Sequence, residues 1–269
     1  MATRRPFKQV PKFTVFELTL AEQCAIDLWN GVNYVDGEEM EVSDEEFFID
    51  FALPFYDLVK NLITRNLITE FSIRRLIRVA NLKALFRSAN PTDFQAGIHC
   101  IANDIVPLYN GMISKTLNLT PTGYGTRALL ELGTRFVTPI KAPTRNGNYR
   151  VPLASRVLFF AIPDMLLFNF SNELAEAMLF QKRPQAAIPF FMETLHTGLI
   201  LNNGLHSMEL PPPNIMGSVL YKKIQKTDWW QRRVLDLALL LHFGVVSARP
   251  QLHTKARQIV ARKKTISTP

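Results

Sequence analysis

The segment TDWWQRRVLDLALLLHFG, residues 227–244, indicates most directly which kind of fold this chain adopts. Thr227 is a favourable N-cap residue for a helix that covers the rest of the segment. Gly244 is placed to end that helix, because glycine readily takes the left-handed conformation of a helix C-terminus. Pro250 then suits the first turn of a further, basic helix. We therefore predict two consecutive helices from residue 227 onward.

The same start and stop signals recur upstream. Thr19 with Glu22, and Ser43 with Glu46, have the spacing of a capping box, and Gly31 is placed to end the first of these two helices. Helical periodicity continues between them and the C-terminal helices. Further helical segments are predicted at about 54–67, 72–88, 122–136, 153–161, 164–181 and 185–201.

Signals for β-strands are weak. Asn146-Gly147 is a preferred hairpin turn, but Pro139, Pro143 and Pro152 make its flanks poor members of a β-ladder. We interpret 137–152 as a long basic segment between two lobes. The predicted fold class is all-α, with two helical lobes, an inter-lobe basic groove and an extended N-terminal arm. The predicted domains are an N-terminal arm (1–17), an N-terminal helical lobe (18–145), a C-terminal helical lobe (146–248) and a basic C-terminal arm (249–269).

Charge is distributed unevenly along the 269 residues, whose formal net charge is +8. Residues 13–57, the acidic block, hold twelve carboxylates and neither Lys nor Arg. From residue 58 onward there are 27 basic and 11 acidic residues, a net charge of +16. Such a basic body favours a polyanionic partner, because positive surface displaces counterions from phosphates. The acidic block either needs a basic partner, such as a neighbouring copy of the chain, or is a solvated surface without one.

No motif for catalysis or metal binding stands out. The five histidines lack metal-ligand spacing, and Cys24 and Cys100 are too far apart in sequence to form a short metal or redox motif. These thiols are expected to pack as small hydrophobic groups in a reducing compartment. Gly123 to Ala128 fits the Gly-x-Gly-x-x-Ala dinucleotide pattern, but no buried strand precedes it, so we interpret it as a chance match that opens a helix. We expect no enzyme activity, cofactor or bound metal.

The longest apolar runs, 157–170 and 234–246, are both interrupted by charged residues. Neither reaches the length of about 20 residues that a membrane-spanning helix needs. The first dozen residues also lack the apolar stretch of a secretion signal. We therefore expect a soluble protein with no membrane insertion.

Two regions concentrate basic side chains. Residues 72–88 place three arginines opposite an apolar helix face, which suits either phosphate binding or simple solvation. Residues 127–156 interleave bases with aromatic rings, which suits single-strand binding, since charges hold the backbone and rings stack on bases. A merely exposed basic linker has a similar composition. The candidate RNA-binding residues are Arg74, Arg78, Tyr124, Arg127, Arg135, Lys141, Arg145, Tyr149, Arg150, Arg156, Lys182 and Arg183.

Both ends of the chain are basic. The first 16 residues also contain too many large apolar side chains to remain in water, so we expect this arm to dock on its own body or in the groove of a neighbouring copy. The candidate oligomerisation residues are Phe7, Val10, Phe13 and Phe16. The C-terminal bases are Lys255, Arg257, Arg262, Lys263 and Lys264. A nuclear-import patch or a disordered tail is the alternative for either end.

Three short segments in the second half of the chain follow a known pattern. They are LTPTGYGTR (119–127), VPLASRV (151–157) and Arg232-Arg233-x-Leu235 continuing to Phe243-Gly244-Val245. Together they resemble the nucleoproteins of bunyaviruses, in particular the phlebovirus type, over roughly 119–260; residues 17–70 have no counterpart. The resemblance implies an RNA groove between two helical lobes, RNA contacts at Arg127 and Arg156, and exchange of the N-terminal arm between subunits. Flexuous plant-virus coat proteins share this general design.

Charge, aromatic rings and resemblance together predict a viral nucleoprotein that encapsidates single-stranded genomic RNA without sequence specificity. It is expected to oligomerise through arm exchange into a ring or filament, in the virion and the host cytoplasm. Expected partners are single-stranded RNA, further copies of the chain and, as an additional candidate, a viral polymerase. Two alternatives are a helical matrix or scaffold protein on anionic membrane surfaces, and an accessory subunit of an RNA-guided ribonucleoprotein.

Overall fold

The computed structural model is mostly helical. It describes residues 8–49, 155, 159, 168–179, 188–203, 210–215, 219, 221–222 and 228–266. These residues contain no strand, and their one β pairing is an isolated bridge between Val32 and Glu39. The all-α prediction is confirmed for this part of the chain. The predicted Asn146-Gly147 hairpin, the predicted lobe boundary near residue 145 and the predicted helices at 54–67, 72–88 and 122–136 lie outside the described residues.

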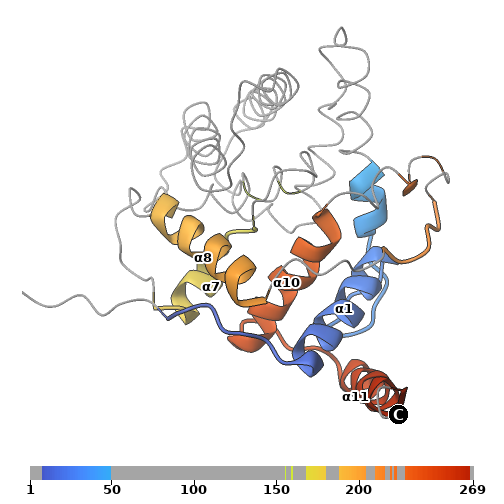
Figure 1. The fold of residues 1–269 in the computed structure, drawn as a ribbon. Helices are drawn as coiled ribbons and strands as arrows, with labels where there is room; N and C mark the ends of the chain where they lie inside the picture. Colours follow the sequence, from blue (N-terminus) through green and yellow to red (C-terminus); the bar gives the residue numbers. More distant parts are fainter. Residues whose placement is uncertain are drawn as a thin grey trace, which may run out of the picture. The chain divides into compact units, whose positions relative to one another are not determined.

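The chain divides into two compact units, each assembled from distant stretches of sequence. The first comprises Met1–Glu45, Glu173–Lys182 and Thr197–Pro269, and the second Glu46–Asn172 and Arg183–His196. Figure 1 labels the five helices whose bounds the structure gives. They are α1 (Val15–Trp29), α7 (Asn172–Ala177), α8 (Ile188–Asn203), α10 (Trp229–His242) and α11 (Pro250–Ile266). In the first unit, α1 packs against both α10 and α11.

Helix α1 begins earlier than its sequence signal predicted. Thr14 is the N-cap in an extended conformation, and its side chain accepts the backbone N–H of Glu17 at 3.2 Å. The Glu17 carboxylate accepts the Thr14 N–H in return, which completes a capping box. The prediction that Thr19 caps this helix was therefore wrong. Thr19 lies one turn inside α1, where its hydroxyl donates to the carbonyl of Val15.

Glycine ends two of the helices, as predicted. Gly31 follows α1 and Gly244 follows α10, both with positive φ, 76° and 66°. After α1, the N–H of Val32 donates back to the carbonyl of Asp27, and after α10 the N–H of Val245 donates to Leu240. These six-residue closures form Schellman motifs, which satisfy carbonyls that would otherwise lack partners.

Other helix boundaries agree with the prediction to different degrees. A helix spans 44–49 directly after Ser43, and Pro250 is the first residue of α11, both as predicted. The N-cap position of α10 is Asp228 rather than Thr227. The helix predicted over 164–181 was wrong in extent, because α7 covers only Asn172–Ala177 within the described residues. Leu179, with a φ of 64°, cannot continue a right-handed helix.

Three tryptophans form the core between α1 and α10. Trp29 lies 6.0 Å from the ring centres of both Trp229 and Trp230, and all three side chains are buried. Aromatic pairs at this separation in tilted or edge-on arrangements contribute beyond the area they bury. This contact joins the N-terminal helix to a helix that begins about 200 residues later.

A buried ion pair lies in the same unit. Nε of Arg233 on α10 donates to Oδ2 of Asp44 at 2.7 Å, and a second carboxylate, that of Asp236, lies 3.6 Å from Nη1. Burial alone would lower the pKa of Arg233, but the two carboxylates raise it above the ordinary value of arginine. The guanidinium is therefore charged, and Asp44 compensates it inside the unit.

Aromatic packing also characterises the described residues of the second unit. The ring centre of Phe170 lies 6.0 Å from that of Phe191 on α8, edge to face, and Phe168 lies 5.5 Å from His196. The backbone N–H of Phe170 donates to the hydroxyl of Ser155 at 3.0 Å. His196 is buried.

Replacement of the α1 cap tests the observed start of the helix. Thr14→Ala removes the acceptor for the Glu17 N–H and should lower the free energy of unfolding by about 1 kcal/mol. Thr14→Ser keeps a hydroxyl in place and should stay close to wild type. Chemical denaturation of both variants measures the difference. Equal stability of the alanine and serine variants would contradict the cap.

Candidate functional site

The predicted RNA-binding residues, from Arg74 to Arg183, all lie outside the described residues, as does Phe7. Of the residues singled out from sequence, the structure places Val10, Phe13 and Phe16 of the arm and the bases of the C-terminal helix. Both groups belong to the first unit. The candidate site therefore consists of these two features.

Residues 8–14, here called the docked segment, run in extended conformation before α1 and lie along the ends of other helices of the first unit (Figure 1). The N–H of Lys8 donates to the carbonyl of Met178, just after α7. Val10 and Phe13 are buried. These two apolar side chains of the arm are thus removed from water by their own chain.

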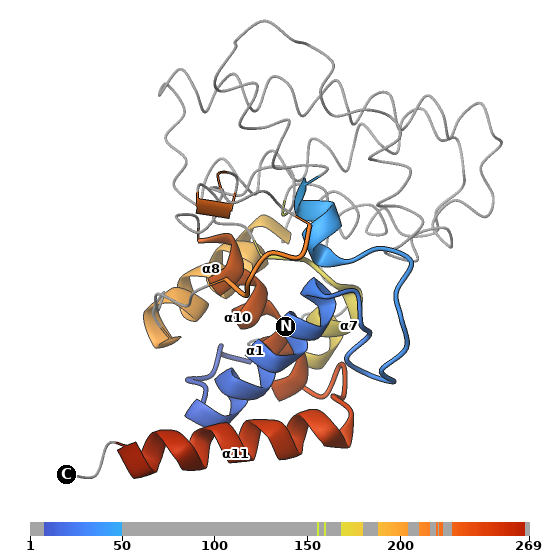
Figure 2. The same ribbon diagram turned by 90° about the vertical axis from the view of Figure 1, so that its right-hand side faces the viewer.

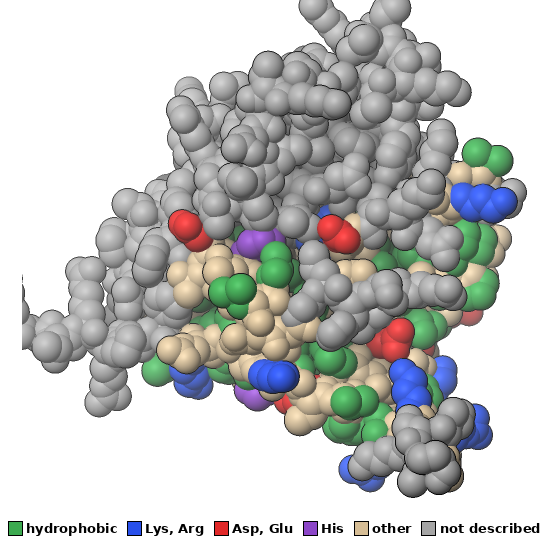
Figure 3. Space-filling model, viewed as in Figure 1, with side chains coloured by type: hydrophobic (Ala, Val, Ile, Leu, Met, Phe, Trp, Pro, Cys, Tyr) green, Lys and Arg blue, Asp and Glu red, His purple; other side chains and the backbone are tan. Residues whose placement is uncertain are grey.

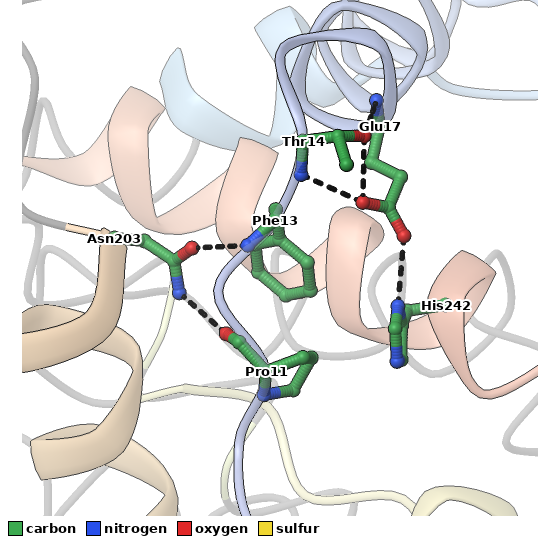
Figure 4. Close-up of polar contacts among 6 residues, drawn as sticks. All are labelled: Pro11, Phe13, Thr14, Glu17, Asn203 and His242. Atoms are coloured by element: carbon green, nitrogen blue, oxygen red, sulfur yellow. Dashed lines mark hydrogen bonds and ion pairs between the residues drawn. The ribbon is translucent and has the colours of Figure 1, made fainter.

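Two asparagines at the end of α8 hold the backbone of the docked segment. Oδ1 of Asn203 accepts the N–H of Phe13 at 2.7 Å, and its Nδ2 donates to the carbonyl of Pro11 at 3.1 Å (Figure 4). Nδ2 of Asn202 donates to the carbonyl of Val10. A side-chain amide can replace a neighbouring strand here because it offers a donor and an acceptor together. Sequence reasoning missed both residues, and nothing in their local pattern distinguishes them.

The end of α10 closes the site around the start of α1. Nδ1 of His242 lies 2.8 Å from Oε1 of Glu17, and its ring centre lies 5.9 Å from that of Phe13 (Figure 4). The ammonium of Lys8 lies 5.4 Å from the ring centre of Phe243, within range of a cation–π contact. Burial raises the pKa of Glu17, but hydrogen bonds from Thr14 and His242 outweigh it, and the net pKa is lowered.

Gly198 gives the docked segment room to approach α8. A Cβ at this position would lie 2.8 Å from Cβ of Val10 and 2.9 Å from its Cγ2. No real pair of carbon atoms packs so closely, so any larger residue would push the segment away. Gly198 therefore acts as a steric requirement of docking rather than as a helix breaker.

Docking on the chain's own body is one of the two outcomes predicted for the arm. Phe16 follows the docked segment on α1, and its ring centre lies 6.2 Å from that of His253 on α11. A role for Val10, Phe13 and Phe16 in oligomerisation stays a prediction.

Several carboxylates of the acidic block are paired within the chain. Asp27 on α1 accepts from Nη2 of Arg249 at 2.7 Å, and Asp44 pairs with Arg233 as described above. The Glu45 carboxylate accepts the backbone N–H groups of Asn214 and Ile215 at 2.9 Å each. For Asp27 and Asp44, the basic partner that was one of the two alternatives for the acidic block is thus supplied by the same chain.

Four basic side chains of α11 are exposed, unlike the paired side chains of Arg233 and Arg249. Lys255, Arg257, Arg262 and Lys263 all face solvent on a helix of 17 residues that contains no acid. Figure 3 shows basic side chains around the region that α11 occupies in Figure 1. We call these four residues the α11 basic surface.

Other kinds of site have little support in the described residues. No group of His, Cys, Asp or Glu there could hold a metal ion. Cys24 is fully buried, and burial raises the pKa of its thiol to about 12, so it packs as a small hydrophobic group, as predicted. Among the described helices, none combines the length and the apolar character needed to cross a bilayer.

No protein-family model, curated protein or solved structure matches this chain. The likeness to bunyavirus nucleoproteins noted in short segments therefore stays a prediction. The interpretation of the site depends on the geometry of the chain itself.

A double-mutant cycle tests the close approach of Val10 to Gly198. Gly198→Ala should displace the docked segment and raise trypsin cleavage after Lys8 and Lys12 about fivefold, the equivalent of one lost docking interaction of about 1 kcal/mol. In a Val10→Gly background, which removes the clashing Cβ, the same substitution should produce no further increase. Equal increases in both backgrounds would contradict the contact.

The charge of Glu17 should contribute to stability in a pH-dependent way. Because its pKa is lowered on folding, its contribution is present above the unfolded glutamate pKa of about 4.3 and is lost as the pH falls through the folded value. Glu17→Gln keeps the capping acceptor and removes only the charge. At pH 7 the variant should be less stable than wild type by up to about 1 kcal/mol. Denaturation between pH 7 and pH 3 should show this gap closing; a constant gap would argue against the assignment.

Proposed function

We propose that this chain binds single-stranded RNA without sequence specificity and coats it as a nucleoprotein, with copies linked by exchange of their N-terminal arms. The observation that carries the proposal is the contrast between arginines that are paired inside the chain and bases that are exposed on its surface. Carboxylates of the acidic block neutralise Arg233 and Arg249 inside the first unit, whereas Lys255, Arg257 and Arg262 of α11 face solvent. With the acidic block counted, the formal net charge of the whole chain is still +8, and this basic surplus is left for a polyanion.

The docked segment supports the second half of the proposal. Its seat on α8 and α10 recognises backbone groups through Asn202 and Asn203 and a short apolar stretch through Gly198. Every copy carries the same arm and the same seat, so an exchanged arm would make the contacts that the chain's own arm makes. Linking copies in this way would join their RNA-binding surfaces into a continuous path.

The membrane-surface alternative has less support. Proteins that lie on bilayers insert an apolar helix face beneath a basic one. On α11, Leu252 and Ala256 are buried in the chain, so this basic helix presents no such face. The apolar face of α11 packs against the rest of the first unit, and its polar face is the one that a partner can contact.

Salt dependence of RNA binding tests the proposal. On a single strand, the logarithm of the binding constant should fall by about 0.7 per log unit of salt for each phosphate neutralised. The variant Arg127→Gln/Arg156→Gln should reduce this slope by up to about 1.4, and Arg127→Lys/Arg156→Lys should keep it. Filter binding to two unrelated RNA sequences between 50 and 300 mM salt measures slope and specificity.

The wild-type result decides the function class. Similar affinities for the two sequences, with a steep salt slope, support coating of RNA. A flat salt response, or co-sedimentation with anionic liposomes without RNA binding, would overturn the proposal.

A further inference from the structure

We infer that the exposed face of α11 is a phosphate-binding surface for single-stranded nucleic acid, in addition to the residues between 74 and 183. This inference rests on the proposed function and adds a site to it. It starts from the side chains of α11 and from the way the rest of the unit holds this helix.

Three exposed bases of α11, Lys255, Arg257 and Arg262, lie along two edges of one exposed strip. Lys255 and Arg262 are seven residues apart, two helical turns, and so lie on the same side about 10 Å apart along the axis. Arg257 lies on the opposite edge. The strip between the edges carries small or uncharged exposed residues: Thr254, Gln258 and Ala261. A phosphate backbone can lie on such a strip with cations on both sides and no acid on the helix to repel it.

The helix is held firmly, which favours binding by its side chains. Leu252 and Ala256 are buried, and α11 lies across α1 (Figure 2). At its start, Arg249 pairs with Asp27, and its N–H donates to the carbonyl of Tyr34 at 3.0 Å. Because the backbone is already ordered, binding would cost only the ordering of a few side chains.

The guanidinium of Arg249 is enclosed between Asp27 and a loop. A Cβ on Gly37, which has a φ of 87°, would collide with Nη1 of Arg249. The carboxylate of Asp27 thus pairs with Arg249, the residue directly before α11. Lys255 also lowers the pKa of Asp27, against the larger raising effect of burial, so it lies within electrostatic range of this acid. Two cations, Arg249 and Lys255, therefore lie near the single carboxylate of Asp27, and Arg249 forms the ion pair with it.

Helix stability alone does not explain these bases. Arg262 and Lys263 are close to the C-terminus of α11, where positive charge favours the helix dipole. Lys255 and Arg257 are in the first half of the helix, where positive charge gains nothing from the dipole. No described carboxylate forms an ion pair with Lys255, Arg257 or Arg262. An external polyanion is the partner that fits this charge.

The test compares charge removal with charge conservation on the full chain. Lys255→Gln/Arg262→Gln should reduce the salt slope of binding to a 30-nucleotide single-stranded RNA by up to about 1.4, from two phosphate contacts of about 0.7 each. Lys255→Arg/Arg262→Lys should keep the slope. Gln258→Ala, on the same exposed strip, controls for a general disturbance of the helix. Circular dichroism should show equal helix content for all variants.

The outcomes separate this inference from the proposed function. Wild-type binding with a slope that the glutamine variant leaves unchanged overturns the α11 surface and leaves the RNA function standing. No RNA binding by wild type overturns the proposed function and this surface together. Binding to anionic vesicles that depends on Lys255 and Arg262, without RNA binding, also overturns the inference and assigns α11 to a membrane surface. A reduced slope in the glutamine variant alone supports it.

Discussion

The first unit depends on the buried ion pair between Arg233 and Asp44, which are separated by 189 positions in the sequence. Removal of the Asp44 carboxylate would destabilise the unit by up to about 3–5 kcal/mol, because the buried guanidinium would lose its nearer carboxylate and keep that of Asp236, 3.6 Å away. The pair therefore keeps Asp44 of the acidic block beside α10. Trp29 packs on Trp229 and Trp230 in the same unit, so apolar contact and charge act together. The first 45 residues are consequently part of the same compact unit as the last 73.

This pairing changes the meaning of the charge pattern. Twelve carboxylates without one Lys or Arg suggest a block made for an external basic partner. In the folded chain, Asp27 and Asp44 instead neutralise arginines that fasten α10 and α11. Acids from the N-terminal part of the sequence thus pair with arginines from its C-terminal part. Exposed bases of α11 remain on the surface, and they are the reason that a polyanion is the partner we propose.

The docked segment shows how an arm can be ordered without forming a strand. Asn203 supplies both the acceptor and the donor that a neighbouring backbone would offer, and Gly198 leaves space for Val10. The segment leads directly into the capping box at Thr14 and Glu17, and the latter also contacts His242. Docking of the arm and the start of α1 are therefore coupled, since the same residues take part in both.

The sequence by itself determined the features that depend on a few neighbouring residues. The helix ends at Gly31 and Gly244 and the start at Pro250 could be predicted because each reflects the conformational range of one residue type. The start of α1 was not predicted in this way: Thr14, rather than the predicted Thr19, caps α1 where the docked segment leads into it. Asn203 could not be predicted as part of the site at all. Only the tertiary structure decided which acid meets which arginine and where the arm lies, because these contacts join residues 189 to 222 positions apart and have no local signature.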